Sequence, residues 1–367
     1  MVLPPRRIAT AGWVGVALLA CGACSGIRPS QGVLTPVAVS AEGSSRVSVL
    51  AVTNRRRSTN DTGDMFSGER AEDVSYAAIT VSIPPDSSRN IGQVQWPSSL
   101  PGNPQTDFVT ASADYLDKQA FIASLSRIAK ETGRNSVLVF VHGFNNRFDD
   151  AVYRFAQVVH DSKAGGIPVL FTWPSRGELG LGAYAYDRES AIYSRDAMEQ
   201  LLDTLAANPN VKEVNILAHS MGNWVALEAL RGKAISGHGK IGSKIKNGYL
   251  IAPDVDVDVF RTQIQRMGTP RPRFALFVSQ DDPALGLSKF LWGGMQRLGS
   301  VNPEEGQYRS IIERQQIAVF DLTTLEGSDA HNKAFDDITK VVVMVREQLN
   351  DEPVVTGGRR IAGAPTQ

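Results

Sequence analysis

The stretch VNILAHSMGNW, residues 214–224, decides the fold prediction. Its first half, VNILA, is a largely apolar run typical of a short buried strand, and the apolar spacing from Trp224 onward is typical of a helix. Between them stands Ser220, with Gly222 two places further on. A strand, a sharp turn and a helix are the context of a nucleophile elbow, in which a serine hydroxyl projects above the carboxyl edge of a parallel sheet. The alternative is a serine that only caps the helix.

The residues that flank this turn are small. The usual elbow pattern is G-x-S-x-G, and here Ala218 stands at the first glycine position and Gly222 at the second. Alanine is small enough to let the chain bend tightly at Ser220. The pattern therefore favours a serine nucleophile.

Apolar runs and amphipathic segments alternate on both sides of the turn. Further strands are predicted at 47–53, 76–84, 137–144, 167–174, 247–255, 273–282 and 316–322. Helices are predicted between the later strands, one of them at 188–207, except that an irregular stretch is predicted between 282 and 316. A last helix carries Ile338, Val341, Val342 and Val345 on one face. Such alternation predicts an α/β fold with a mostly parallel sheet and helices on both faces. The turn-rich segment 84–105 is predicted to be a loop.

Composition excludes several classes of protein. The 367 residues are 42% hydrophobic, enough for a substantial core, so the chain is globular rather than disordered. Lys+Arg and Asp+Glu balance at 38 each, which leaves no basic footprint for nucleic acid. Both cysteines, Cys21 and Cys24, lie near the start, so the rest of the chain has no disulfide framework, cysteine metal site or thiol nucleophile.

The amino terminus has the layout of an export signal. A basic pair precedes an apolar stretch that is too short to span a bilayer comfortably, and LLAC ends at Cys21. This segment is similar to the lipobox of bacterial lipoproteins, where the cysteine is acylated. The alternative is an ordinary signal peptide cut near Ala23. We therefore expect an exported protein, anchored to a membrane on its periplasmic or cell-surface side.

These features predict the division of the chain into four parts. Residues 1–20 are expected to be the signal peptide and residues 21–45, rich in Gly, Pro and Ser, a flexible tether. A single α/β domain is expected over 46–350, followed by a disordered tail over 351–367.

A serine nucleophile needs a base and an acid that orients it, and in this fold they follow in the order serine, acid, base. Only His238 and His331 follow Ser220. His238 precedes the next strand, whereas His331 follows the last one, so His331 is the predicted base. An exposed loop histidine is the alternative.

The acid should follow a late strand. Asp281 and Asp282 end the strand at 273–282, and Asp282 is preferred because it precedes a proline in a natural turn. Asp254, at the end of the preceding strand, is the second candidate. Turn or capping chemistry is the alternative for each of them.

The oxyanion of the tetrahedral intermediate needs backbone N–H donors. One donor should be the amide of Met221, and the other the amide of Phe144 or Asn145 in the loop after the strand at 137–144. Gly143 would let that loop approach the substrate. His142 is expected either to orient the loop or to be a histidine satisfied in the core.

One pattern imitates a metal site. Asp254, Asp256 and Asp258 resemble the opening of a calcium loop, but the sixth position is Val259 and the twelfth is Gln265. Glycine and glutamate are required there, so no metal and no cofactor is expected.

Several segments together resemble a bacterial alpha/beta-hydrolase family long known only as a domain of unknown function. They are VLVFVHGFNNRFDDAVYRFAQ (137–157), FTWPS (171–175), AHSMGNW (218–224), IAPDVDVDVF (251–260) and FVSQDDPALGLS (277–288). The resemblance runs from about Val47 to Leu349. It implies an esterase-like serine hydrolase, and the family pattern S-x-x-D-x-A-L falls on Asp282. It supplies no substrate.

The predicted function is therefore a membrane-tethered serine hydrolase that cleaves carboxylic esters through an acyl-enzyme on Ser220. Its partners would be an ester or lipid-like small molecule and the membrane, without nucleic acid. The segment LSKFLWGGMQRLG (287–299) could border the pocket or be an ordinary packed helix. Two alternatives stay open: a binding lipoprotein that retains the fold without turnover, and an acyltransferase that uses the same triad.

Overall fold

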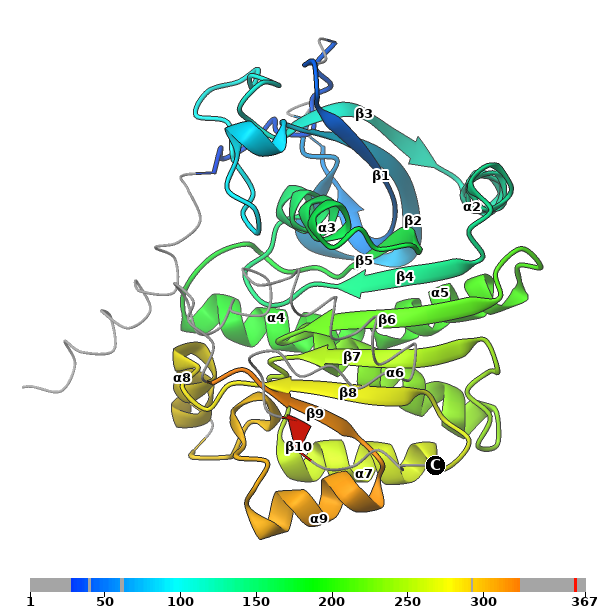
Figure 1. Ribbon diagram of the computed structural model, residues 1–367, viewed down its shortest axis with the longest axis vertical. Helices are drawn as coiled ribbons and strands as arrows, with labels where there is room; N and C mark the ends of the chain where they lie inside the picture. Colours follow the sequence, from blue (N-terminus) through cyan, green and yellow to red (C-terminus); the bar gives the residue numbers. More distant parts are fainter. Residues whose placement is uncertain (1–27, 39–40, 60–62, 292, 324–359, 362–367) are drawn as a thin grey trace, which may run out of the picture.

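The computed structural model describes residues 28–38, 41–59, 63–291, 293–323 and 360–361. In this part of the chain a ten-stranded sheet has the order β10-β9-β8-β7-β6-β4-β5-β1-β2-β3 (Figure 1). Its strands are β1 (Ser45–Arg57), β2 (Phe66–Ile83), β3 (Val109–Leu116), β4 (Ser136–Val141), β5 (Ile167–Thr172), β6 (Glu213–His219), β7 (Ile245–Ile251), β8 (Arg273–Val278), β9 (Ala318–Asp321) and β10 (Arg360–Ile361).

The helices alternate with these strands over most of the described chain. They are α2 (Lys118–Thr132), α3 (Phe148–Ser162), α4 (Leu181–Tyr193), α5 (Arg195–Ala207), α6 (Gly222–Ser236), α7 (Val257–Met267), α8 (Pro283–Leu291), α9 (Gly306–Arg314) and the short 3-10 turns η1 (Asp86–Ser88) and η2 (Leu298–Ser300). No helix among the described residues is both long and apolar enough to cross a bilayer.

The sheet is mostly parallel. Neighbouring strands from β1 through β5, β4, β6, β7 and β8 to β9 are parallel, whereas β2, β3 and β10 pair antiparallel with their neighbours. The predicted fold class is confirmed. From β4 the chain moves first to β5 on one side and then to β6 on the other, so the strand order reverses at β4. The carboxyl ends of β4 and β6 are where such folds bind ligands.

Helices cover both faces of the sheet, as the apolar runs predict. In β4, Val137, Val139 and Val141 pack into the core shared with α2, α5, α6 and α7. Phe140 points the other way and packs against α3, where its ring stacks on Phe155 at 5.2 Å. The strand can therefore be apolar on both sides because neither side meets water.

One predicted helix is two. The segment predicted as 188–207 forms α4 and α5, which meet at Ser194. The Ser194 hydroxyl donates to the carbonyl of Ser190 at 2.7 Å, and its oxygen accepts from Asn54 Nδ2 at 3.0 Å. These contacts tie the break to β1, a partner that periodicity along the helix does not reveal.

The pattern analysis missed β3, α2, the helix α9 in a segment predicted to be irregular, and the two-residue β10 in the predicted disordered tail. The limits of α2 carry ordinary capping signals: Asp117 accepts the amide of Ala120 at 2.7 Å, and Gly133 ends the helix with a φ of 69°. The sequence therefore holds the information for α2. β3 lies at the edge of the sheet, and its buried and exposed residues do not alternate regularly, so its sequence gives no clear strand signal.

The segment 21–45 differs from the expected flexible tether in its described part. Val33 and Leu34 are 3% and 1% exposed, and the amide of Val37 donates to the carbonyl of Thr110 at 2.8 Å. Burial of this apolar pair fixes the chain against α3 and β3.

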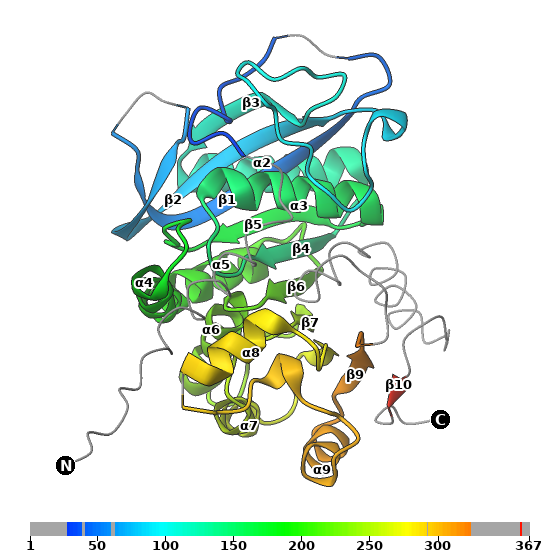
Figure 2. The same ribbon diagram turned by 90° about the vertical axis from the view of Figure 1, so that its left-hand side faces the viewer.

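The arrowheads of β4, β6, β7 and β8 point the same way in Figure 1, so their carboxyl ends form one edge of the molecule. Figure 2 turns this edge toward the viewer, with α4 and α8 in front of the strand ends.

Candidate active site

The chain reverses at Ser220, between the end of β6 and the start of α6. Its φ of 48° places a non-glycine residue in the left-handed region, a strained conformation that costs about 1–3 kcal/mol and is often found at functional sites. The amide of Ser220 donates to the carbonyl of Ile251 at 2.9 Å, which ties the turn to the end of β7. The residue is 5% exposed. The amino end of α6, with its positive dipole, begins two residues later.

Asn223 fastens this turn and was missed by the pattern analysis. Its Nδ2 donates to the carbonyls of Ser220 at 2.9 Å and Ile251 at 3.2 Å, and its side chain is fully buried. Nothing in the spacing around the serine marks an asparagine three residues on as its support, because one of the two acceptors comes from β7.

Two predicted glycines lie where backbones meet. A Cβ on Gly222 would overlap the carbonyl of His142 and lie 2.6 Å from that of Val141, so α6 packs directly on the end of β4. A Cβ on Gly143 would lie 3.0 Å from Ser220 Cβ. The loop after β4 therefore touches the turn at Ser220.

The predicted oxyanion donors lie in these two segments. Among the described residues the backbone amides of Met221 and Phe144 donate no hydrogen bond. The amide of Asn145 donates to Asp187 Oδ2 at 3.3 Å. Of the two loop residues considered, Phe144 is therefore the one whose amide makes no hydrogen bond within the described part of the chain. Its ring lies edge-on to Tyr184 at 5.3 Å.

A buried arginine supports the loop from below. Arg55, on β1, is almost fully buried, and its guanidinium donates to the carbonyls of Ser175 at 2.8 Å and Asn146 at 2.7 Å. It also donates to Thr172 Oγ1 at 2.9 Å. Burial lowers the pKa of Arg55 to about 10, and the carboxylate of Asp187 opposes this shift, so the side chain is charged at neutral pH. The pattern analysis did not single out Arg55.

His142 is a structural member of the same network. Its Nδ1 lies 2.8 Å from the carbonyl of Gly143, which can only accept, so Nδ1 carries the proton. Nε2 then accepts from Thr172 Oγ1 at 2.9 Å and from Arg55 Nη2 at 3.3 Å. Burial, and then the charge of Arg55, lower the pKa of His142 to about 3, so the ring is neutral. It stacks on Trp173 with ring centroids 4.9 Å apart.

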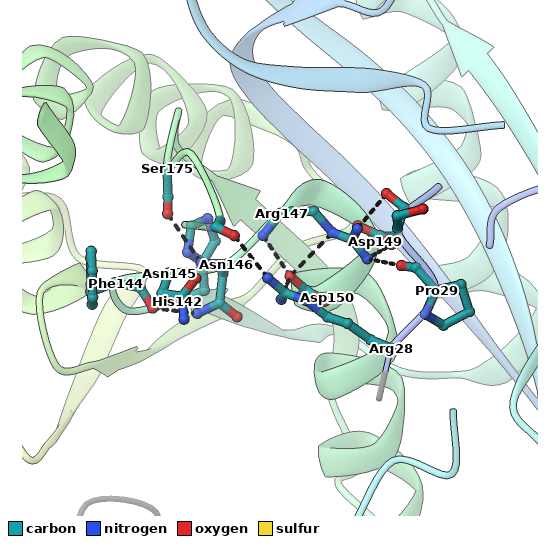
Figure 3. A network of polar contacts seen from close by, with 12 residues as sticks. Arg28, Pro29, His142, Phe144, Asn145, Asn146, Arg147, Asp149, Asp150 and Ser175 are labelled. Atoms are coloured by element: carbon teal, nitrogen blue, oxygen red, sulfur yellow. Dashed lines mark hydrogen bonds and ion pairs between the residues drawn. The ribbon is translucent and has the colours of Figure 1, made fainter. Parts of the chain in front are cut away.

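Asp187, on α4, holds the other side of the loop and was also missed. Its carboxylate accepts the hydroxyl of Ser175 at 2.5 Å, the amide of Arg176 at 2.9 Å and the amide of Asn145. Burial raises its pKa, and these hydrogen bonds act against the shift. Figure 3 shows Ser175 on one side of the loop 142–147 and Arg28 with Pro29 on the other.

The two candidate acids have different surroundings. Asp254 accepts the hydroxyls of Ser288, at 2.6 Å, and Tyr184, and Arg297 Nε lies 3.4 Å from the same carboxylate. This carboxylate joins α4 to α8. Asp282 is buried at the end of β8, and its Oδ1 accepts the amides at the start of α8, from Ala284 at 2.9 Å and Leu285 at 3.1 Å.

The remaining acidic residues considered have local roles. Asp281 is exposed and accepts the hydroxyl of Ser279 at 2.6 Å. Asp256 caps α7 by accepting the amides of Asp258 at 2.9 Å and Val259 at 3.1 Å. In the described ranges no group of three His, Cys, Asp or Glu side chains is placed to hold a metal ion.

Two histidines follow Ser220 in sequence, and the structure describes only one of them, His238. His238 lies beyond the carboxyl end of α6, whose 15 residues span about 22 Å, so it lies near the opposite edge of the sheet from Ser220. It therefore cannot serve as base. His331 and the lipidation candidate Cys21 lie outside the described residues. β9, after which His331 follows in sequence, ends at the same edge as β6.

The segment 287–299 borders this edge. Ser288 of α8 is buried against Asp254, whereas Phe290 is 70% exposed. Residues 287–291 thus end a helix that is packed on one side and open to solvent on the other, whereas 293–299 form a turn, a β-bridge residue and the start of η2.

Comparisons with solved structures find matches of low similarity. The lin2722 gene product of Listeria innocua is 11% identical, with 60% of this chain and 96% of that chain covered and a TM-score of 0.37. An uncharacterized protein of Bacillus cereus is 13% identical, with 63% and 70% covered and a TM-score of 0.37. An esterase of Pyrococcus furiosus is 11% identical, with 60% and 84% covered and a TM-score of 0.36.

No curated protein matches this sequence. Residues 117–348 match a family that is described as "Alpha/beta hydrolase of unknown function (DUF900)". The match covers α2 and everything from β4 to β9, including the turn at Ser220 and the loop at Phe144. The chain belongs to this family of alpha/beta hydrolases.

Proposed function

We propose that this protein is a serine hydrolase that cleaves carboxylic esters through an acyl-enzyme on Ser220. The observation that carries the proposal is the left-handed backbone of Ser220 at the end of β6, with φ at 48°. A strained non-glycine residue persists only where its surroundings hold it, and Ile251 and Asn223 do so here. The sequence order serine, acid, histidine adds support.

In the proposed reaction Ser220 Oγ attacks the ester carbonyl carbon while His331 takes the hydroxyl proton. His331 returns this proton to the leaving alcohol, and a water molecule then hydrolyses the acyl-enzyme by the same route. Asp282 would orient the imidazole. The amides of Met221 and Phe144 would donate to the oxyanion, an effect worth roughly 3 kcal/mol per donor.

Membrane attachment is part of the proposal. Acylation of Cys21 would hold the domain at a membrane surface, and a lipid ester would then be a substrate within reach. The support is the sequence LLAC after a short apolar stretch.

Labelling of the full chain by a fluorophosphonate probe tests the nucleophile. We expect wild type to be labelled and Ser220→Ala to lose at least roughly 10⁴-fold in labelling rate. Ser236→Ala, an exposed serine on the same helix, should label like wild type. His331→Ala should also lose labelling, whereas His238→Ala should not.

The acid is assigned by comparing Asp282→Asn with Asp254→Asn. Loss of labelling only in the first, with both variants folded, would support Asp282. A panel of p-nitrophenyl esters of increasing chain length then tests turnover. Folded wild type that is not labelled would favour the binding lipoprotein. Labelling without ester hydrolysis, but with transfer to an added alcohol, would favour the acyltransferase.

A further inference from the structure

The amino-terminal end of the described chain is attached beside the candidate active site. Arg28 pairs with Asp150, at the start of α3, and donates to the carbonyl of Gly177 at 2.9 Å (Figure 3). Arg147 donates to the carbonyls of Pro29 at 2.7 Å and Ser30 at 2.5 Å. The chain therefore leaves the domain at the loop that follows β4.

This attachment limits how the domain can sit on a membrane. Six residues lie between Cys21 and Arg28, and the seven Cα–Cα steps that join them span at most about 25 Å. A globular domain of about 300 residues is about 50 Å across. A tether of half that length cannot let the far side of the domain face the bilayer, so an acyl chain on Cys21 would hold the Arg28 side toward it.

The same side exposes large apolar side chains. Leu179 is 43% and Leu181 is 50% exposed, in the segment that follows Gly177. Phe290, on α8, is 70% exposed, and Met295 is 46% exposed. We define these four residues as the apolar rim.

The rim is held together by polar contacts underneath. Tyr184 of α4 donates to Asp254 and lies 3.0 Å from Ser288 Oγ of α8. Leu181 and Phe290 thus stand on two helices that are joined to each other. Both helices lie in front of the strand ends in Figure 2. The rim therefore borders the edge on which Ser220 and Phe144 lie.

We propose that the apolar rim docks on the bilayer that holds the acyl chain of Cys21, so that the edge bearing Ser220 faces the lipid. This proposal rests on the acyl anchor of the proposed function and extends it by naming the face. Leucine and phenylalanine side chains insert into the interfacial region of a bilayer, where they lose contact with water. A substrate that reaches Ser220 from the lipid would not have to cross open solvent.

A fluorescence experiment on the full-length, acylated protein in phosphatidylcholine vesicles tests the face. The reporter dye NBD is attached at Leu181→Cys or Phe290→Cys, in a chain that also carries Cys24→Ser. The matched control is Ile235→Cys, because Ile235 is 41% exposed at the far end of α6. We expect doxyl-labelled lipid to quench the dye at the two rim positions at least about threefold more strongly than at the control position.

Equal quenching at all three positions would overturn the docking face. Failure of the protein to float with the vesicles would overturn the anchor and the face together. If a second copy covers the rim, the dye at Leu181→Cys would be shielded without vesicles, which would overturn the assignment to a bilayer. Fluorophosphonate labelling of Ser220 in the same samples reports separately on the nucleophile.

Discussion

The two segments that build the candidate site are held by different means. The turn at Ser220 is held by backbone geometry and by Asn223, three residues away, which binds two carbonyls. The loop at Phe144 is held from a distance, by Arg55 of β1 below it and by Asp187 of α4 beside it. The first segment depends on close packing of backbones, and the second on buried charge. Substitutions in the two segments should therefore lower the stability of the protein for different reasons.

The largest effect is expected for Arg55→Met. The substitution leaves the carbonyls of Asn146 and Ser175 without their donor and leaves Asp187 without a nearby buried cation. We expect the free energy of unfolding to fall by about 3–5 kcal/mol in urea denaturation. Arg46→Met, an exposed arginine on the same strand, should change it by less than about 0.5 kcal/mol. Equal stability of the two variants would show that the loop does not depend on buried charge.

The next effect sharpens the contrast between backbone and side-chain contacts. Gly222→Ala pushes a Cβ against the carbonyls of Val141 and His142 at the end of β4. The free energy of unfolding should therefore fall by about 3 kcal/mol, and the labelling of Ser220 should slow. Gly143→Ala places a Cβ 3.0 Å from His219 Nδ1 and from Ser220 Cβ, which is looser than the contacts at Gly222, so it should lower the free energy of unfolding by only about 1 kcal/mol.

Gly286→Ala, in α8, is the control, because nothing lies near its Cβ position, and it should stabilise by about 0.5 kcal/mol. A larger decrease in the free energy of unfolding for Gly143→Ala than for Gly222→Ala would contradict the packing described at the turn.

The last effect is absent at neutral pH and appears only in acid. The pKa of His142 is lowered from 6.5 to about 3 by burial and by Arg55. Below pH 6.5 the His142 ring is protonated in the unfolded chain, whereas in the folded chain it stays neutral down to about pH 3. His142 should therefore cost stability as the pH falls through this window, by at most about 1.4 kcal/mol per pH unit, and have no effect above it.

Denaturation at a series of pH values measures this slope. His142→Asn should flatten the curve between pH 6.5 and 3 relative to wild type, whereas replacement of the exposed His238 serves as the control. An unchanged slope in His142→Asn would mean that the ring is protonated in the folded protein.

Much of the fold could be predicted because its signals are local. Continuous apolar runs mark strands buried on both faces, and the sheet confirms this for β4, where Val139 and Phe140 pack on opposite faces. The position of the turn at Ser220 could be read in the same way, from a strand, small residues and a helix in sequence. The break at Ser194 could not, because the contact that accompanies it comes from Asn54 of β1, 140 residues away.

The features of the candidate site also fall into those with local sequence signals and those that depend on distant contacts. The sequence alone determined an α/β architecture and a sharp turn at Ser220, after a strand and between small residues. Only the tertiary structure decided that Arg55 and Asp187 support the loop at Phe144, that Asp254 joins two helices and that the chain enters beside the site at Arg28. The physical reason is distance along the chain: Arg55 and His142 are 87 residues apart, and only the strand order that places β1 beside β5 and β5 beside β4 brings them together.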